Sequence, residues 1–389
     1  MSTRTAGRTR VRGRSTPSAL VRHVVTWGDR RAVVQGWLAS RGLIALVALL
    51  LAVTQQRSVL ELVNNWDAVH FGNLAAGGYL AEPGGLLMAF FPGFPAVLRL
   101  GLWAGVPTQV TGVVVAAIGS AIAAAALTRL GGPWAAIAWL FAPTAVFTAV
   151  PYTESMFCAA AFWAWERARS DRWLAAVLLA AVAGSVRVSG LFLVGALFVM
   201  IITTRGIDRA TRFRRTAMLL VPAAVIGGYV VFLHQLTGSW NAWYAAQSTG
   251  WVRGLTPPWQ SLLNTIPAIT PGAFPDHPGW AWVFRGEVVS MALGLVVTGW
   301  CLARRMWAEA SYVGIQVFAF SLSYWFFSVN RALLLWFPLW IMLAQWGTWQ
   351  PRRAGLRRVH RVVVVAAWVV GVVLMLVWSW LFLTGHWAS

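Results

Sequence analysis

The stretch Phe90-Phe91-Pro92-Gly93-Phe94-Pro95 decides how this chain is threaded, because it interrupts one of the chain's many apolar runs. Two prolines and a glycine within four residues prevent a regular helix there. The run extends over residues 86–104 and also contains Arg99. We therefore predict that 86–104 does not cross a membrane but forms a re-entrant or juxtamembrane element. Its irregular backbone would be surrounded by protein or by a water-filled cavity.

The composition is that of a membrane protein with many spans. Of the 389 residues, 59% are hydrophobic and only 11% are charged, whereas about a quarter of the residues in a soluble domain are charged. Several apolar runs are shorter than the roughly 20 residues that cross a bilayer upright, so their edges are approximate. The runs lie near residues 38–54, 86–104, 107–128, 133–150, 155–166, 173–186, 189–204, 216–234, 287–303, 311–329, 332–348 and 362–384.

The basic residues indicate which loops face the cytoplasm. All 31 are arginines, and short loops rich in arginine stay on the cytoplasmic side. If every run crossed and the N-terminus were inside, four arginine clusters would face outward. They are 167–172, 205–215, 304–305 and 352–361. Removing 86–104 as a crossing returns all four to the cytoplasm. The sequence thus predicts an all-α polytopic integral membrane protein with about 11 transmembrane helices. Its N-terminus would be cytoplasmic, and an outward amphipathic or re-entrant segment would follow the first helix.

The same distribution divides the chain. Residues 1–36 contain many arginines and no apolar run, which predicts a disordered cytoplasmic tail, and 37–389 are expected to form a single multi-pass transmembrane domain. Its main outward segments would be 55–106 and 235–286, the second rich in tryptophans that suit either stacking on sugar rings or anchoring at the interface. The net charge of +20 lies on loops beside apolar runs, so we expect the lipid bilayer, and no nucleic acid, as partner. Both cysteines lie inside apolar runs and no zinc pattern occurs, so neither a disulfide framework nor a metal site is expected.

The first outward loop contains a candidate catalytic carboxylate, Asp67. Residues 58–76 are predicted to form an amphipathic helix on the membrane surface, with Asp67 and His70 on one face. A carboxylate beside Trp66 at the interface is poorly solvated, which raises its basicity and suits a general base. The alternative is an interfacial helix anchored by Trp66, with Asp67 facing water.

Three further charged residues are expected at outward ends of spans. Glu154 lies in a short turn between apolar runs, where it is either functional or a first-turn carboxylate that stabilises a helix N-terminus. Arg187 and Arg331 are lone outward arginines, and their planar donor fork suits a lipid phosphate. The alternative for each arginine is snorkelling to the interface.

Five short motifs, in the same order along the chain, resemble those of PIG-V-type mannosyltransferases. They are Asn65-Trp66-Asp67-Ala68-Val69-His70-Phe71 with Ala75 and Gly78-Tyr79, Phe90-Phe91-Pro92-Gly93-Phe94-Pro95, Pro151-Tyr152-Thr153-Glu154-Ser155-Met156-Phe157, Arg187-Val188-Ser189-Gly190, and Arg331-Ala332-Leu333 with Phe337-Pro338-Leu339. The sequence departs from the family pattern at Thr153, at Val188-Ser189 and at Ala332, where that family has Ser, Ser-Asn and Tyr.

The resemblance implies a GT-C glycosyltransferase, a multi-pass enzyme that takes a sugar from a polyprenyl-phosphate carrier on the non-cytoplasmic face. Asp67 would be the catalytic base, and Trp66, His70, Tyr152, Glu154, Arg187 and Arg331 would bind substrates. The expected donor is polyprenyl-phosphate-mannose and the expected acceptor an extracytoplasmic glycolipid or glycan, at the plasma membrane of a bacterial cell envelope. No cofactor is expected, because arginines can hold the departing phosphate. The alternative function is a transporter or flippase for a lipid-linked sugar.

Overall fold

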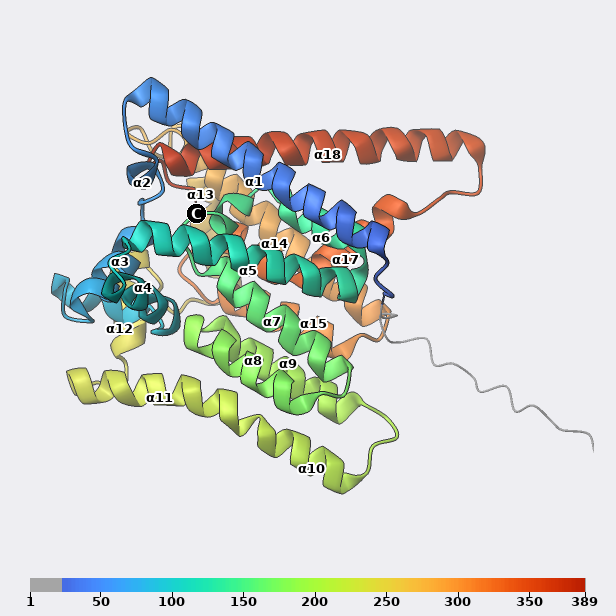
Figure 1. Ribbon diagram of the computed structural model, residues 1–389, viewed down its shortest axis with the longest axis horizontal. Coiled ribbons are helices and arrows are strands. Elements are labelled where there is room, and N and C mark those ends of the chain that lie inside the picture. The colour runs from blue at the N-terminus through green and yellow to red at the C-terminus, as the bar shows by residue number, and fades with distance from the viewer. Residues whose placement is uncertain (1–22, 389) are drawn as a thin grey trace, which may run out of the picture.

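The computed structural model describes residues 23–388, and every regular element among them is a helix (Figure 1). The elements are α1 (Trp27–Gln55), α2 (Val59–Leu62), α3 (Asp67–Gly77), η1 (Pro83–Ala89), α4 (Gly93–Trp103), α5 (Thr108–Gly131), α6 (Pro133–Leu140), η2 (Ala145–Thr148), α7 (Glu154–Arg169), α8 (Trp173–Val186), α9 (Ser189–Thr203), α10 (Arg209–Met218), α11 (Leu220–Thr237), α12 (Ala242–Trp251), α13 (Pro258–Ala268), α14 (Trp280–Ala303), α15 (Trp307–Ser321), α16 (Val329–Ala332), η3 (Leu333–Leu335), α17 (Phe337–Thr348) and α18 (Ala354–Leu383). Five described helices are long and apolar enough to cross a membrane. The chain is therefore an all-helical multi-pass membrane protein, as predicted, while the number of eleven crossings stays a prediction.

The long helices lie side by side along the longest axis of the molecule, which separates two ends (Figure 1). The N-terminus of α1, the arginine-rich α10 and the start of α18 lie at one end. The short helices α2, α3, α4 and α12 lie at the opposite end. The arrangement of the arginine clusters along the sequence predicted that the basic loops and the motif-bearing segments lie at opposite ends.

The 86–104 run is broken where the prolines and glycine predicted. Its two helices, η1 and α4, meet at an angle of 105°. The backbone carbonyls freed by the break are bound by protein side chains: the Tyr229 hydroxyl donates to Met88 and Phe90, at 2.8 and 2.9 Å, and the Tyr79 hydroxyl donates to Phe90 at 3.0 Å. The irregular backbone is thus enclosed by protein, which membrane depth requires.

Two predicted boundaries are wrong. Residues 27–36, which were assigned to the disordered tail, form the first turns of α1. Thr26 and Asp29 make a capping box that starts the helix there. Residues 1–22 of the predicted tail lie outside the described residues. The predicted surface helix over 58–76 is two helices, α2 and α3. The break spans residues 63–66 and contains Asn65, whose side-chain amide donates to the Leu62 and Phe382 carbonyls, both at 2.9 Å.

Two glycines on α5 allow close approach to the turn that precedes α7. A Cβ atom at Gly119 would lie 3.0 Å from the backbone carbon of Ser155, and one at Gly112 would overlap Pro151. Because neither glycine has a side chain, the 151–155 segment is held directly against α5. This contact fixes the depth at which Tyr152 and Glu154 enter the site.

Candidate active site

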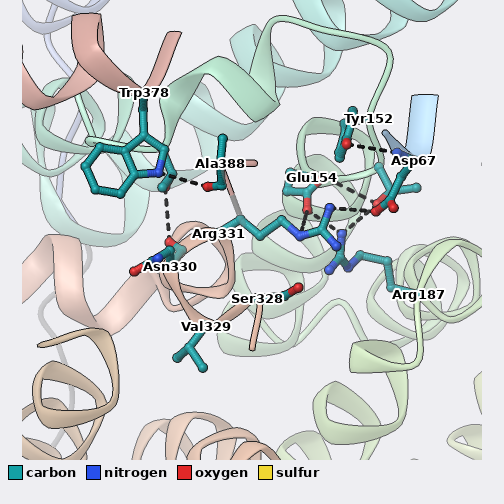
Figure 2. Close-up of polar contacts among 12 residues, drawn as sticks. Asp67, Tyr152, Glu154, Arg187, Ser328, Val329, Asn330, Arg331, Trp378 and Ala388 are labelled. Carbon is teal, nitrogen blue, oxygen red and sulfur yellow. Dashed lines mark hydrogen bonds and ion pairs between the residues drawn. The ribbon is translucent and has the colours of Figure 1, made fainter. Parts of the chain in front are cut away.

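Asp67 forms an ion pair with Arg331, although 264 positions separate them in the sequence (Figure 2). Arg331 Nη1 lies 2.7 Å from Asp67 Oδ2, and each residue is 8% exposed. The backbone N–H of Asp67, at the start of α3, donates to the Tyr152 hydroxyl at 3.1 Å. Asp67 is therefore not the solvated carboxylate of the alternative interpretation.

Glu154 and Arg187 extend this pair into a network of alternating charge (Figure 2). Arg187 Nη1 lies 2.6 Å from Glu154 Oε1 and donates to the Thr153 hydroxyl, also at 2.6 Å. Arg331 Nε lies 3.8 Å from the same Glu154 oxygen. Glu154 thus joins the two arginines, and both arginines point into the protein rather than snorkelling to an interface.

Buried Glu287, on α14, places Arg331. Its carboxylate accepts hydrogen bonds from three successive backbone N–H groups, those of Ser328, Val329 and Asn330, at 3.0, 2.6 and 3.0 Å. These are the N–H groups that the start of α16 leaves unpaired. Arg331 follows in the same short helix, so Glu287 fixes the direction of its side chain.

Glu287→Gln is expected to destabilise the protein by about 2 kcal/mol or more, because an amide nitrogen cannot accept these hydrogen bonds. The measurement is thermal unfolding of the purified protein in detergent. Glu61→Gln is the matched control, since the Glu61 side chain is 60% exposed and pairs with Arg57 in an exposed ion pair. Equal unfolding midpoints for the two variants would contradict the assigned role.

Strained backbone conformations precede both members of the ion pair. Trp66, immediately before Asp67, has φ 56° and ψ −128°, and Ser328, shortly before Arg331, has φ 64°. A positive φ is uncommon for residues other than glycine, and such strain gathers at functional sites. The Trp66 indole is held by a hydrogen bond of 3.1 Å to the His386 carbonyl.

Two cavities meet at Asp67 and Arg331. The larger has a volume of about 420 Å³ and mostly aromatic walls, and we call it the aromatic cavity. Its aromatic lining is Trp66, His70, Phe147, Tyr152, Trp251, Trp280, Phe284, Trp325, Phe327, Phe382 and Trp387. The smaller cavity, about 90 Å³, is lined by three arginines, and we call it the arginine pocket. The arginines are Arg187, Arg253 and Arg331.

Arg253 is a site residue that no motif indicated. Among the described residues, no carboxylate lies within ion-pair distance of it, and its Nε has no hydrogen-bond partner. Burial, and then the positive charges of Arg331 and Arg187, lower the pKa of Arg253 to about 10. The sequence signal was its position as a lone arginine in an outward, tryptophan-rich segment.

The pKa values of Arg331 and Tyr152 are shifted as well. Burial works to lower the pKa of Arg331, but the carboxylates of Asp67 and Glu154 outweigh it and hold this pKa above its usual value. Burial, reinforced by the charge of Asp67, raises the pKa of Tyr152 well above its ordinary range. Tyr152 therefore stays a neutral hydroxyl beside the ion pair.

The structure brings most of the predicted site residues together. Trp66, Asp67, His70, Tyr152 and Arg331 line the aromatic cavity, and Arg187 lines the arginine pocket. Glu154 lines neither cavity and is fully buried, so it would act on a ligand indirectly, by positioning Arg187 and Arg331.

The tryptophans of the 235–286 segment divide between the two predicted roles. Trp251 and Trp280 line the aromatic cavity and Trp243 lines the arginine pocket. Trp240, Trp259 and Trp282 are each more than 60% exposed, at 64%, 69% and 68%, which suits interface anchoring.

The fold and site define the class of protein: a multi-pass helical membrane protein with a buried charged site between two cavities at one end of its bundle. No family model matches the chain. The chain is similar to GPI alpha-1,6-mannosyltransferase 2. The rat protein is 34% identical over 154 residues and the human protein 33%, in matches that cover 35% of this chain and 31% of each relative. The match thus spans about a third of the relatives' own length. The predicted resemblance to PIG-V-type mannosyltransferases is confirmed.

Among solved structures, the chain resembles the crystal structure of ArnT from Cupriavidus metallidurans bound to undecaprenyl phosphate. The two chains are 14% identical in sequence, and their TM-score is 0.47. The similarity covers 90% of this chain and 76% of that chain.

Proposed function

We propose that this protein is a GT-C glycosyltransferase that transfers mannose from polyprenyl-phosphate-mannose to an extracytoplasmic glycolipid or glycan. The observation that carries the proposal is the Asp67–Arg331 ion pair at the junction of the arginine pocket and the aromatic cavity. A sugar transferase with a phosphate leaving group needs an anion site and a proton acceptor side by side. These two residues supply both at one point.

The donor phosphate belongs in the arginine pocket. Three arginines border it, while Asp67 and Glu154 are the carboxylates paired with them, so positive charge is in excess. Among the described residues, Arg253 has no carboxylate within ion-pair distance, and a bound phosphate relieves its repulsion from the other two arginines. Guanidinium groups match phosphate oxygens in geometry as well as in charge.

Donor binding also activates Asp67. In the free protein this carboxylate accepts a hydrogen bond from Arg331, which occupies one of its two oxygens. A phosphate in the arginine pocket competes for the same guanidinium. Asp67 is then free to accept a hydrogen bond from an acceptor hydroxyl once the donor is in place.

The chemical step is a single displacement. Asp67 takes the proton of an acceptor hydroxyl, the hydroxyl oxygen bonds to the anomeric carbon, and the bond from that carbon to phosphate oxygen breaks with its electron pair. The transition state resembles an oxocarbenium ion. Arg187, Arg253 and Arg331 stabilise the charge that develops on the departing phosphate. A β-linked donor gives an α-linked product.

We propose that the protein lies in the plasma membrane; the arginine distribution supports a cytoplasmic N-terminus and an extracytoplasmic site. Ala273→Cys, in an exposed loop between α13 and α14, is expected to react with an impermeant thiol reagent in intact cells. Ala354→Cys, exposed at the start of α18, is expected to react only after permeabilisation. Cys158 and Cys301 are buried and serve as an unlabelled background. The reverse pattern would invert the topology.

The test of function is a transfer assay with the purified protein in nanodiscs, radiolabelled polyprenyl-phosphate-mannose and a mixture of glycolipid acceptors. A new radiolabelled glycoside is the expected product. Arg57→Gln, at an exposed ion pair outside both cavities, is the control variant. Movement of the lipid-linked sugar across a vesicle membrane, with no glycoside formed, would identify the protein as a flippase instead.

A further inference from the structure

His70 is held by a partly buried acidic partner, Glu82. Its Nδ1 lies 2.9 and 2.8 Å from the two carboxylate oxygens of Glu82, and the Asn73 side-chain amide donates to the same carboxylate at 2.8 Å. The imidazole stacks on Phe90, with ring centroids 5.6 Å apart, and meets the edge of Trp251 at 6.4 Å. The orientation of the ring is therefore fixed on several sides.

This arrangement determines what His70 offers to the aromatic cavity. A carboxylate only accepts hydrogen bonds, so the hydrogen shared with Glu82 lies on Nδ1. In the neutral ring, Nε2 is then an acceptor. No described residue forms a hydrogen bond with Nε2, and His70 lines the aromatic cavity. A ligand hydroxyl is the partner that this geometry lacks.

The walls of the cavity suit the faces of a sugar ring. Aromatic side chains dominate them, and few lining residues carry polar groups, chiefly Asp67, His70, Tyr152, Ser328 and Arg331. Apolar walls with a small number of placed polar groups are typical of sites that orient a small ligand. The cavity volume of about 420 Å³ gives room for such a ring.

Asp67 and His70 stand three positions apart on α3, so their side chains are neighbours on one face, with Cβ atoms about 5–6 Å apart. We infer that the aromatic cavity is the acceptor subsite and takes a pyranoside with two adjacent hydroxyls. One hydroxyl donates to Asp67 and reacts; its neighbour donates to His70 Nε2. His70 is then a specificity-determining residue, and Glu82 is a positioning residue. The inference rests on the proposed function and assigns the acceptor class to that site.

The test separates the hydrogen bond to a ligand from the contact with Glu82. His70→Asn places an amide N–H near the position of Nδ1, so it can still donate to Glu82, but it has nothing at the position of Nε2. His277→Asn is the matched control, because His277 also stacks on an aromatic ring, with its centroid 4.5 Å from that of Trp280, yet lines neither cavity. The probes are octyl glucoside, octyl mannoside and their monodeoxy analogues.

For the parent glycoside that reacts, His70→Asn is expected to raise KM about 3- to 10-fold, the value of one hydrogen bond, with a smaller change in kcat. One monodeoxy analogue should show the same loss with the wild-type protein and no further loss with the variant. Glu82→Gln should weaken this discrimination between parent and analogue. A residue with only a structural role would not change this ratio. His277→Asn should behave as wild type.

Two results would overturn the inference. If His70→Asn keeps wild-type KM and discrimination, the ring only braces η1 against α3. If the variant loses equally toward the parent and every deoxy analogue, the ring does not contact a hydroxyl. Binding of the same glycosides to the Asp67→Asn protein, followed by titration calorimetry, separates failure of the subsite from failure of the transfer reaction. If the glycosides bind but the wild-type protein forms no product, the subsite stands and the proposed function fails; if they do not bind, the subsite fails.

Discussion

Asp67→Asn is expected to reduce mannosyl transfer by about a hundred- to ten-thousand-fold, the usual contribution of a general base. The asparagine keeps the shape of the side chain and can still accept a hydrogen bond from Arg331. It cannot take a proton from the acceptor. The measurement is single-turnover transfer with saturating donor and acceptor, together with thermal unfolding to establish that the variant is folded.

Asp276→Asn is the control for this prediction, because Asp276 is an exposed carboxylate in the loop before α14 and lines neither cavity. It should keep wild-type turnover. Near-normal turnover of Asp67→Asn would remove Asp67 as the base. Glu154 could not replace it directly, because it is fully buried and lines neither cavity. The remaining proton acceptor in the aromatic cavity would be His70.

Replacing Arg331 with lysine is expected to slow transfer at limiting donor by about 10- to 100-fold, and Arg187→Lys by a similar factor. Lysine keeps the charge but loses the planar fork that binds two phosphate oxygens at once. The double variant should lose much less than the product of the two single losses. The two arginines share Glu154, at 2.6 and 3.8 Å, so they act as a unit.

The readout is the transfer rate as a function of donor concentration for each variant. Arg57→Lys, in an exposed ion pair, is the control and should leave the rate unchanged. Losses that multiply in the double variant would show that the two arginines act at separate points. Wild-type rates in both single variants would leave Arg253 as the phosphate ligand in the arginine pocket.

Most of the helical framework follows from local sequence. The predicted runs at 173–186 and 189–204 coincide with α8 and α9 to within one residue, because apolar composition and helix length are local properties. The break after Phe90 was also predictable, since proline and glycine act on their own backbone. The start of α1 was missed because the Thr26–Asp29 capping box lies in a segment whose composition resembles a disordered tail.

The candidate site was only partly predictable. The family resemblance and the outward position of lone charges selected Asp67, Glu154, Arg187 and Arg331. Neither signal showed that Arg331 pairs with Asp67 in the free protein. No motif selected Arg253, and its position as a lone outward arginine did not show that it lines the same pocket as Arg187 and Arg331.

By itself, the sequence determined the helical class, the grouping of basic loops and the broken 86–104 run, because hydrophobicity, charge and backbone restriction act over a few residues. The tertiary structure alone decided which charges meet. Arg331 reaches Asp67 because Glu287 caps α16 from another helix. Glu154 is buried next to the arginines because the glycines of α5 allow the 151–155 turn to pack closely against that helix. The division of the site into an arginine pocket and an aromatic cavity likewise arises from segments far apart in the chain. Contacts of this kind depend on how whole helices pack, which no local pattern of residues records.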